Sequence, residues 1–310
     1  MDKFLEPMLA AKPKTESDYD KITYPKLASP KYDGIRAVVR GGKLWSRKGL
    51  LIPNMVLQKR FGRKAYEGFD GELVAGGPEE GFNYCQSVIM SAEHEDTDRV
   101  RYYVFDYLRG NVAGYAYESR NIELRKAVVG GDNSNDRYIV VVDQIPVTKE
   151  GMATYEAACL ADHFEGIMLR DPGGAHKYGR STLREQGLVA IKRFVQAEGR
   201  VYGWEEQMAN TNEATVNELG RTKRSSAKAG KVGKGVLGAF KVVVVACSEA
   251  PELQGAEFNV GTGLNDEQRA IFWKQREGLK GQIITFKFQK HGTIFAPRIP
   301  VFIGFRPDGA

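Results

Sequence analysis

The chain has 310 residues, of which 42% are hydrophobic and 27% charged, a composition typical of a globular protein long enough for two domains. It contains no apolar run of about 18 residues and no apolar segment near its start, so we expect neither a membrane span nor a secretory signal. The net charge of +6 is compatible with a polyanionic partner. Cys85, Cys159 and Cys247 follow no metal-ligand spacing, which predicts free, buried thiols in the cytoplasm.

Short strand-like runs dominate the first two thirds of the chain. Residues 37–40 and 43–46 flank Gly41 and Gly42, a pair that tolerates positive φ, and they predict a β-hairpin. Further strands are expected at 69–75, 101–107, 138–142, 166–170 and 188–194, and helices at 53–61, 119–129 and 149–164. This irregular mixture predicts an antiparallel-rich α+β domain.

The composition changes after Phe194. Lysine, arginine and small residues crowd a segment near 208–234 that cannot bury much apolar surface, so we expect an exposed, mobile basic loop. Around it, strands are predicted at 200–204, 240–246 and 282–288, with a helix at 265–277 that Asn265 or Asp266 would cap. This pattern favours a small β-barrel of the OB type. The predicted domains are residues 1–194 and 195–310.

The hexapeptide KYDGIR at 31–36 is the first candidate for chemistry. Its Asp-Gly turn separates Lys31 from Arg36 and can fold the arginine back toward the lysine. A lysine amine attacks only in its neutral form, which nearby cations or desolvation favour, so Lys31 is a candidate nucleophile. A surface lysine beside a hairpin turn is the alternative, and the hexapeptide alone does not decide between them.

Four further motifs follow in order. FDGEL places Glu72 on an expected strand, and VFDYL places Phe105 beside an acid on another. FEGIMLR places Glu165 before an apolar strand, and VAIKRF places Lys192 inside a strand. Each motif alone is weak evidence, because turn acids and solvated charges are common. Their order and separation within one chain are informative.

The set resembles the covalent nucleotidyltransferases, which comprise ATP-dependent DNA ligases, RNA ligases and mRNA capping enzymes and share a Lys-x-Asp-Gly-x-Arg motif. The resemblance spans essentially the whole chain and is strongest to small two-domain, phage-type DNA ligases. Further matching segments are 46–49, 86–91, 180–183, 260–264 and 298–308. The resemblance implies a nucleotidyltransferase (adenylation) domain followed by an OB-fold domain. The implied enzyme acts in DNA replication, repair and recombination, in the cytoplasm or, if phage-encoded, in that of the host.

The resemblance also implies roles toward ATP, the co-substrate. Lys31 would form a lysyl-AMP phosphoramidate. Ser29 and Pro30 would lie against the adenine edge, Phe105 would stack on the adenine, and Lys192 would touch the α-phosphate. An aromatic face holds a purine with roughly 1–3 kcal/mol.

Charged residues would complete the implied site. Arg36 and Arg47 would hold the ribose and phosphate, or the 5′-phosphate of a nick. Glu72 would contact the ribose and, with Glu165, bind Mg²⁺ or Mn²⁺. Cations and a metal stabilise the negative charge that develops when the α-phosphorus is attacked.

The sequence departs from the family pattern in two places. The first lysine of a usual Lys-x-Lys pair is Ala190 here, and Arg193 or Arg184 could replace it. The usual C-terminal Arg-x-Asp-Lys motif keeps Arg306 and Asp308 but ends in glycine. These two residues are expected to orient pyrophosphate.

The basic loop is the candidate clamp for duplex DNA, because flexible lysine- and arginine-rich segments bind phosphates without reading sequence. Its cations are Arg221, Lys223, Arg224, Lys228, Lys231 and Lys234. A solvated linker is the alternative. The implied partner is nicked double-stranded DNA, clamped between the two domains of a monomer.

Other functions stay open at this point. An RNA ligase or a GTP-dependent capping enzyme shares the five motifs, although 260–264 and the short C-terminal motif favour a DNA ligase. A non-catalytic OB protein is disfavoured by the intact Lys31, Glu165 and Lys192. The four histidines show no shared spacing and receive no catalytic role.

Overall fold

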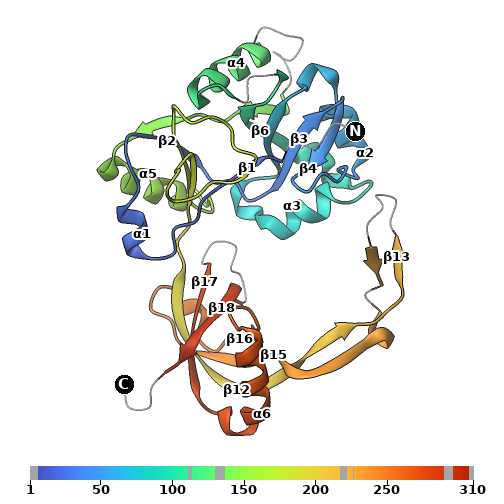
Figure 1. Ribbon diagram of the computed structural model, residues 1–310, viewed down its shortest axis with the longest axis vertical. Coiled ribbons are helices and arrows are strands. Elements are labelled where there is room, and N and C mark those ends of the chain that lie inside the picture. Colours follow the sequence, from blue (N-terminus) through green and yellow to red (C-terminus); the bar gives the residue numbers. More distant parts are fainter. Residues whose placement is uncertain are drawn as a thin grey trace. The chain divides into compact units, whose positions relative to one another are not determined.

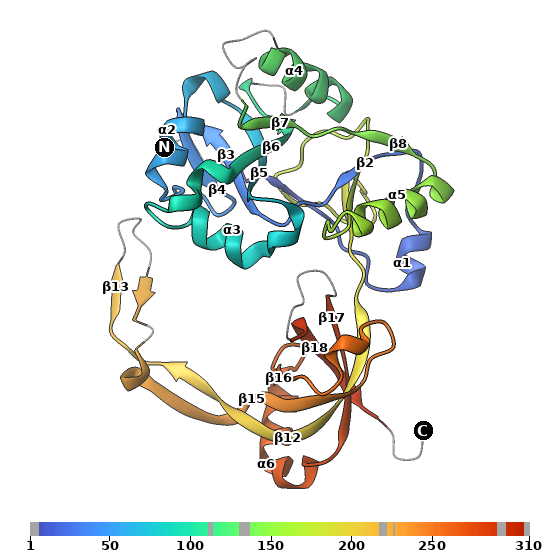
Figure 2. The same ribbon diagram turned by 180° about the vertical axis from the view of Figure 1, so that it is seen from behind.

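The computed structural model describes residues 6–110, 114–129, 137–216, 222–225, 227–289 and 296–306 (Figures 1 and 2). The chain divides into two compact units, Met1–Lys192 and Arg193–Ala310, and each is described by itself. Among the described helices, none has the length and apolar character needed to cross a membrane.

The first unit contains a five-stranded sheet in the order β4-β3-β5-β6-β7. Its strands are β3 (Ile35–Arg40), β4 (Lys43–Ser46), β5 (Phe69–Ala75), β6 (Val100–Tyr107) and β7 (Ile139–Val141). All neighbours are antiparallel except β6 and β7. The predicted hairpin is confirmed, and Gly41 and Gly42 take φ values of 57° and 66° at its turn.

Three helices pack on this sheet: α2 (Met55–Phe61), α3 (Gly81–Ile89) and α4 (Tyr117–Val129). Asn54 begins α2 because its side chain accepts hydrogen bonds from the backbone amides of Val56 and Leu57, both at 3.1 Å. Helix α3 was not predicted. Its sequence starts with glycine and contains few strong helix formers, so burial of Cys85, Val88 and Ile89 against the sheet stabilises it.

A second, four-stranded antiparallel sheet has the order β11-β9-β2-β8. Its strands are β2 (Lys26–Pro30), β8 (Ile145–Val147), β9 (Ile167–Arg170) and β11 (Leu188–Ile191), and helix α5 (Lys149–Ala161) covers its apolar core. The prediction of one strand over 188–194 was wrong. β11 ends at Ile191, because Ile191 pairs with the first residue of β9, Ile167. Lys192 therefore lies just beyond the strand.

Three short elements complete the first unit. Strands β1 (Met8–Leu9) and β10 (Gly179–Arg180) pair in parallel. Helix α1 (Glu16–Asp20) begins at Thr15, whose side chain forms a capping box with Asp18. The three cysteines of the chain are buried and free, as predicted.

The second unit is an antiparallel sheet in the order β16-β15-β12-β17-β18. Its strands are β12 (Val195–Asn210), β15 (Lys231–Ala246), β16 (Glu257–Val260), β17 (Ile283–Gln289) and β18 (Arg298–Phe305). A bridge between Thr262 and Val301 joins its two edges, with the amide of Phe302 donating to the Thr262 carbonyl at 2.8 Å. The sheet thus closes into the predicted barrel. Asn265 caps helix α6 (Asp266–Leu279).

The expectation of a basic loop was wrong for the residues that the structure describes. Strands β12 and β15 continue beyond the barrel as a two-stranded ribbon whose ladder extends to the pair of Asn210 and Lys231 (Figure 1). A short hairpin of β13 (Ala214–Val216) and β14 (Thr222–Arg224) follows. Little apolar surface is available here, but ladder hydrogen bonds satisfy the backbone without a core. We call residues 205–235 the basic ribbon.

Candidate active site

Lys31 lies in the connection between β2 and β3, which belong to different sheets of the first unit. Its amide donates to the Gly166 carbonyl at 2.9 Å, and its carbonyl accepts from the Glu165 amide at 3.2 Å. These bonds extend the pairing of β2 with β9 and fix the backbone of Lys31. At Gly34, a Cβ atom would lie 2.0 Å from the backbone oxygen of Leu73, so the connection requires glycine there.

The aromatic side chain next to Lys31 anchors the connection. Tyr32 stacks on Tyr103 with ring centroids 4.3 Å apart and meets Phe164 edge-on at 5.3 Å. A cavity of about 120 Å³ adjoins these rings and reaches Glu165. The Tyr32 ring therefore packs on Tyr103 and Phe164, whereas the side chain of the neighbouring Lys31 contacts Glu165.

Glu165 joins two lysines of the site. Its Oε2 accepts from the ammonium of Lys31, and its Oε1 accepts from that of Lys192. The Glu165 side chain is only 4% exposed. Burial alone would raise the pKa of this carboxyl, but the charges of Lys31 and Lys192 outweigh burial and lower it. The structure thus brings together three residues that the sequence placed in separate motifs.

Arg36 and Glu72 face each other across β3 and β5, whose register pairs them directly. The guanidinium of Arg36 does not fold back to Lys31 but forms a two-pronged ion pair with Asp70, at 2.5 Å and 2.7 Å. It also lies 4.5 Å from the ring centroid of Phe105. Asp70 is fully buried and received no role from the sequence, although it belongs to the same FDGEL motif as Glu72.

Glu72 has the most consequential pKa of the site. Burial raises the pKa of its carboxyl to about 7, against the opposing charges of Arg36 and Lys31, and the nearby carboxylate of Glu165 contributes in the same direction as burial. Glu72 therefore exchanges its proton near neutral pH, and binding of a cation beside it would favour the carboxylate.

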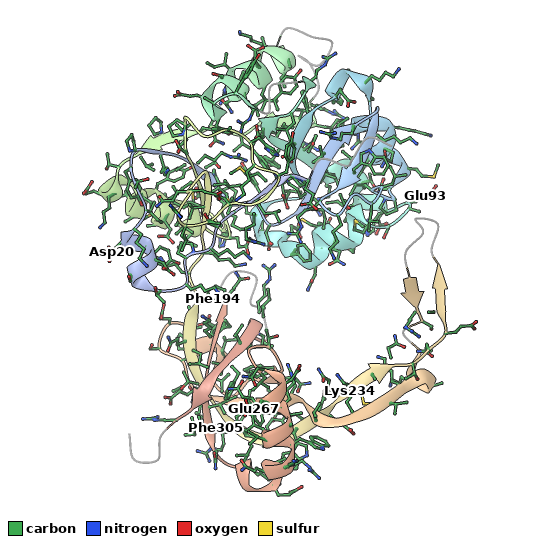
Figure 3. All side chains as sticks on the ribbon, in the orientation of Figure 1. Asp20, Glu93, Phe194, Lys234, Glu267 and Phe305 are labelled. Carbon is green, nitrogen blue, oxygen red and sulfur yellow. The ribbon has the colours of Figure 1, made fainter. Side chains whose placement is uncertain are left out.

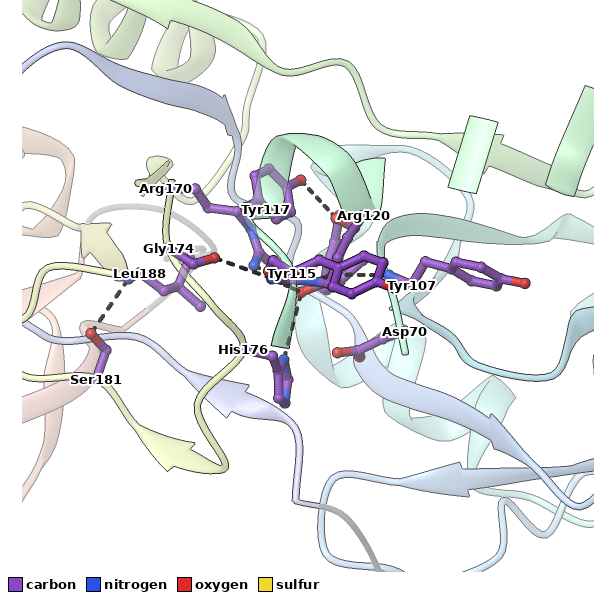
Figure 4. A network of polar contacts seen from close by, with 12 residues as sticks. Asp70, Tyr107, Tyr115, Tyr117, Arg120, Arg170, Gly174, His176, Ser181 and Leu188 are labelled. Carbon is purple, nitrogen blue, oxygen red and sulfur yellow. Dashed lines mark hydrogen bonds and ion pairs between the residues drawn. The ribbon is translucent and has the colours of Figure 1, made fainter. Parts of the chain in front are cut away.

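A buried network surrounds Asp106, the residue after Phe105, and Figure 4 labels Arg120, Arg170 and His176 of this network. Its carboxylate accepts from Arg120 at 2.8 Å and 3.1 Å and from Arg170 at 3.2 Å, and His176 Nδ1 lies 3.7 Å from it. Burial disfavours the charged form, but the proximity of His176 and the two guanidinium groups outweighs this and holds the pKa of Asp106 well below its usual range. Sequence reasoning missed this network, because its members are spread over some 70 residues.

This network positions Phe105. The guanidinium of Arg170 lies 4.5 Å from the ring centroid of Tyr117 and 5.4 Å from that of Phe105. The hydroxyl of Tyr117 donates to the Phe105 carbonyl at 2.7 Å. Phe105 is thus held by its backbone and flanked by two arginines, Arg36 and Arg170.

The remaining predicted residues of the first unit lie near these elements. Ser29 and Pro30 end β2, directly before Lys31, and the Ser29 side chain is buried. Arg47 is exposed on the turn that follows β4. Ala190 is buried in β11, two residues before Lys192.

The predicted residues of the second unit are partly described. Arg306 donates to Glu198 at 2.7 Å, whereas Asp308 lies outside the described residues. Arg221 also lies outside them, and Lys223 is described only in its backbone, within β14. The other cations of the basic ribbon, Arg224, Lys228, Lys231 and Lys234, are exposed, and Figure 3 shows Lys234 on the ribbon.

Two carboxylates of the first unit could hold a magnesium ion. Glu72 and Glu165 provide the oxygens, and the charge of Glu165 contributes to raising the pKa of Glu72. Mg²⁺ prefers oxygen ligands, keeps several waters and needs one or two carboxylates when a substrate phosphate completes its shell. No group of three or more metal-binding side chains occurs in the described part of the chain.

Comparisons with known proteins agree with this arrangement. Residues 229–306 match the family model of the DNA ligase OB-like domain. Chlorella virus DNA ligase-adenylate is 28% identical, with a TM-score of 0.53 and coverage of 97% of this chain and 99% of that one. A structure of a Lig E DNA ligase, at 23% identity, has the same fold, with a TM-score of 0.69 and coverage of 97% and 99%. No curated protein matches the chain.

The fold and the lysine site define a covalent nucleotidyltransferase domain joined to an OB-fold domain. Within that class, the chain is similar over 97% of its length to the viral DNA ligase, and its residues 229–306 match the DNA ligase OB-like domain. The chain therefore resembles the small two-domain DNA ligases.

Proposed function

We propose that this protein seals nicks in duplex DNA with ATP as co-substrate, and that Lys31 carries the AMP. The observation that carries the proposal is the contact of Lys31 with Glu165 and, through it, with Lys192. A lysine on a rigid connection, beside a buried carboxylate and a second cation, suits attack on a phosphoryl group. The rival acceptor, an RNA nick, and the rival nucleotide, GTP, are distinguished by the experiment below.

The reaction has three steps. The neutral amine of Lys31 attacks the α-phosphorus of ATP, so that a phosphorus–nitrogen bond forms and the bond to pyrophosphate breaks. An oxygen of the DNA 5′-phosphate then attacks the lysyl-AMP, takes the AMP and restores the amine. Finally the 3′-hydroxyl attacks the activated phosphate, which forms the phosphodiester and releases AMP.

Residues around Lys31 would support the first step. Lys192 would contact the α-phosphate once Glu165 releases it. Phe105, whose ring has the guanidinium groups of Arg36 and Arg170 beside it, would stack on the adenine. Ser29 and Pro30 would border the base. Developing charge on the phosphoryl oxygens is stabilised best by donors already in place.

Glu72 and Glu165 would hold the divalent metal, Mg²⁺ or Mn²⁺. When bound, the metal supplies positive charge at the phosphoryl oxygens and the leaving group. Its binding would compete with the two lysines for Glu165 and leave Lys31 without its carboxylate partner. A lysine amine attacks only in its neutral form, so Lys31 must also lose a proton before the first step.

The basic ribbon would clamp the duplex. Lys228, Lys231 and Lys234 are exposed and form no ion pair with other described residues, so their charges are available to phosphates. Replacing all three by alanine should weaken nick binding and reduce the salt dependence of log K by up to about 0.9 for each lost contact. Exchange of Lys149, Lys177 and Lys126, which are distant from the ribbon in sequence and pair with carboxylates, is the control. An unchanged salt slope would contradict the clamp.

Arg306 and Asp308 are proposed to orient pyrophosphate during the first step. Arg306 must then exchange its partner Glu198 for phosphate oxygens. Arg306→Ala should impair self-adenylation and spare the sealing of pre-adenylated DNA, and equal loss of both steps would refute the role. We further propose that the enzyme acts as a monomer in the cytoplasm.

One experiment tests the function as a whole. The protein is incubated with Mg²⁺ and either ATP or GTP, and intact mass spectrometry measures the adduct. An AMP adduct that Lys31→Ala abolishes and a Lys26→Ala control keeps supports the proposal, because Lys26 is a lysine of β2 that pairs with Asp171 at 3.9 Å. Sealing is then compared on nicked DNA and nicked RNA. A GMP adduct or a preference for RNA would overturn the assignment.

A further inference from the structure

Lys12 follows Ala11, which is hydrogen-bonded to β11 of the second sheet of the first unit. The amide of Ala11 donates to the Leu188 carbonyl at 2.9 Å, and the Ala11 carbonyl accepts from the amide of Ala190 at 2.9 Å. Ala11 and Val189 form a parallel bridge. Lys12 is therefore fixed beside the position in β11 where this sequence has Ala190 and not a lysine.

The charges of three other cations, Arg180, Lys31 and Arg47, act on Lys12. Arg180, on β10, is held by a hydrogen bond of 2.6 Å from its guanidinium to the Ala10 carbonyl. The Lys12 residue is exposed, but partial desolvation lowers the pKa of its ammonium, and repulsion from Arg180, Lys31 and Arg47 lowers it further. The negative charge of Glu165 acts in the opposite direction. Lys12 is thus electrostatically coupled to the nucleophile and its carboxylate partner.

Glu165 is the carboxylate whose charge acts on Lys12, and its two oxygens already accept hydrogen bonds from Lys31 and Lys192. Lys12 and Arg47 form no ion pair or hydrogen bond with another side chain in the described ranges of the chain. A group of unneutralised cations beside a buried ion pair is stabilised by an anion that several of them can share.

We propose that Lys12 is a phosphate-binding residue of this site and acts with Arg47 and Arg180. A phosphate group presents several acceptor oxygens, so it can bind an ammonium and guanidinium groups together. The inference rests on the proposed function for the source of the phosphate, which is either ATP or the 5′ end of the nicked strand. The family pattern has a lysine at position 190, where this chain has alanine. Lys12, from the segment that pairs with β11 through Ala11, would provide the missing cation.

The test compares Lys12→Gln, which removes the charge at similar length, with Lys12→Arg, which keeps it. Lys14→Gln is the matched control, because Lys14 is an exposed lysine two residues further along whose side chain forms no hydrogen bond or ion pair with another described residue. Three quantities are measured for each: the affinity for inorganic pyrophosphate by calorimetry, the rate of AMP uptake at subsaturating ATP, and the rate of sealing of a pre-adenylated nick. Thermal melting checks that each variant is folded.

We expect Lys12→Gln to reduce at least one of the three quantities by about 10- to 100-fold, as for loss of one charge-assisted contact, and Lys12→Arg to stay within about threefold of the original protein. Losses in pyrophosphate affinity and AMP uptake assign Lys12 to the phosphates of ATP. A loss confined to sealing assigns it to the phosphate of the DNA.

The proposal is overturned if Lys12→Gln matches Lys14→Gln in all three measurements, or if Lys12→Arg fails as severely as Lys12→Gln. Failure of the proposed function has a different signature. In that case the unmodified protein takes up no AMP from ATP, while the calorimetric measurement with pyrophosphate still tests Lys12.

Discussion

Lys31 donates a hydrogen bond to Glu165, a residue 134 positions further along the chain. The same carboxylate accepts from Lys192, so one buried anion holds two cations of the site together. This arrangement keeps the two lysines close to each other. A metal that binds Glu165 would displace the lysines from it, whereas a phosphate that binds the lysines would displace Glu165 from them.

Glu165→Gln should slow AMP uptake by about 100-fold, because the amide provides neither the charge that gathers the lysines nor a strong metal ligand. The rate is measured by intact mass spectrometry over a Mg²⁺ titration, and the Mg²⁺ concentration for half-maximal rate should rise. Glu150→Gln, at the exposed start of α5, is the control. A rate within threefold of the original would show that Glu165 is not part of the reaction.

Glu72 should make stability depend on pH. Because burial raises its pKa from 4.5 to about 7, the folded state holds this proton more tightly than the unfolded state. The contribution of Glu72 to the free energy of unfolding is therefore fully present below about pH 4.5, and it is lost as the pH rises through 7. Relative to Glu72→Gln, the original protein should lose up to about 3 kcal/mol of unfolding free energy between pH 5 and 8. Urea titrations at each pH give the difference, and a constant difference would contradict the raised pKa.

Gly34→Ala should displace the connection that carries Lys31. The added Cβ would meet the Leu73 carbonyl oxygen at 2.0 Å, and a backbone oxygen of a central strand cannot move aside cheaply. We expect AMP uptake to fall by about 100-fold, since a shift of about 1 Å in a reacting group has an effect of that size. Gly278→Ala is the control, because its Cβ meets nothing within 4 Å and lies in α6. Equal rates for the two variants would rule out the steric argument.

Asp106→Asn should destabilise the first unit by about 3–5 kcal/mol, because two buried guanidinium groups would lose their carboxylate. Chemical denaturation measures the change. Asp98→Asn is the control, since Asp98 pairs with Arg60 but its side chain is 80% exposed, and surface pairs contribute little. If both variants lose equally little unfolding free energy, the buried network around Asp106 does not stabilise the first unit.

The local elements and the motif residues were largely predictable from the sequence. Short strand-like runs predicted β5 and β6, the glycine pair predicted the hairpin turn, and Asn265 was one of two predicted caps for α6. These features depend on residues within a few positions of one another, and their physical causes act over the same range. The family resemblance then supplied the roles of Lys31, Glu72 and Glu165, which no single motif could define.

The contacts between distant segments required the tertiary structure. No local pattern indicates that Asp106 binds Arg120 and Arg170, or that Asp70 and not Lys31 receives the guanidinium of Arg36. The basic ribbon was mistaken for a loop because a ladder between distant strands stabilises it without apolar residues. The hydrogen bonds between Ala11 and β11 bring Lys12 near the site, and no sequence pattern indicated them. The sequence by itself determined which residues are candidates for the chemistry of the first unit, because their types and order are local features. The pairing of strands decided which charges neutralise one another around Lys31, because it brings distant segments together.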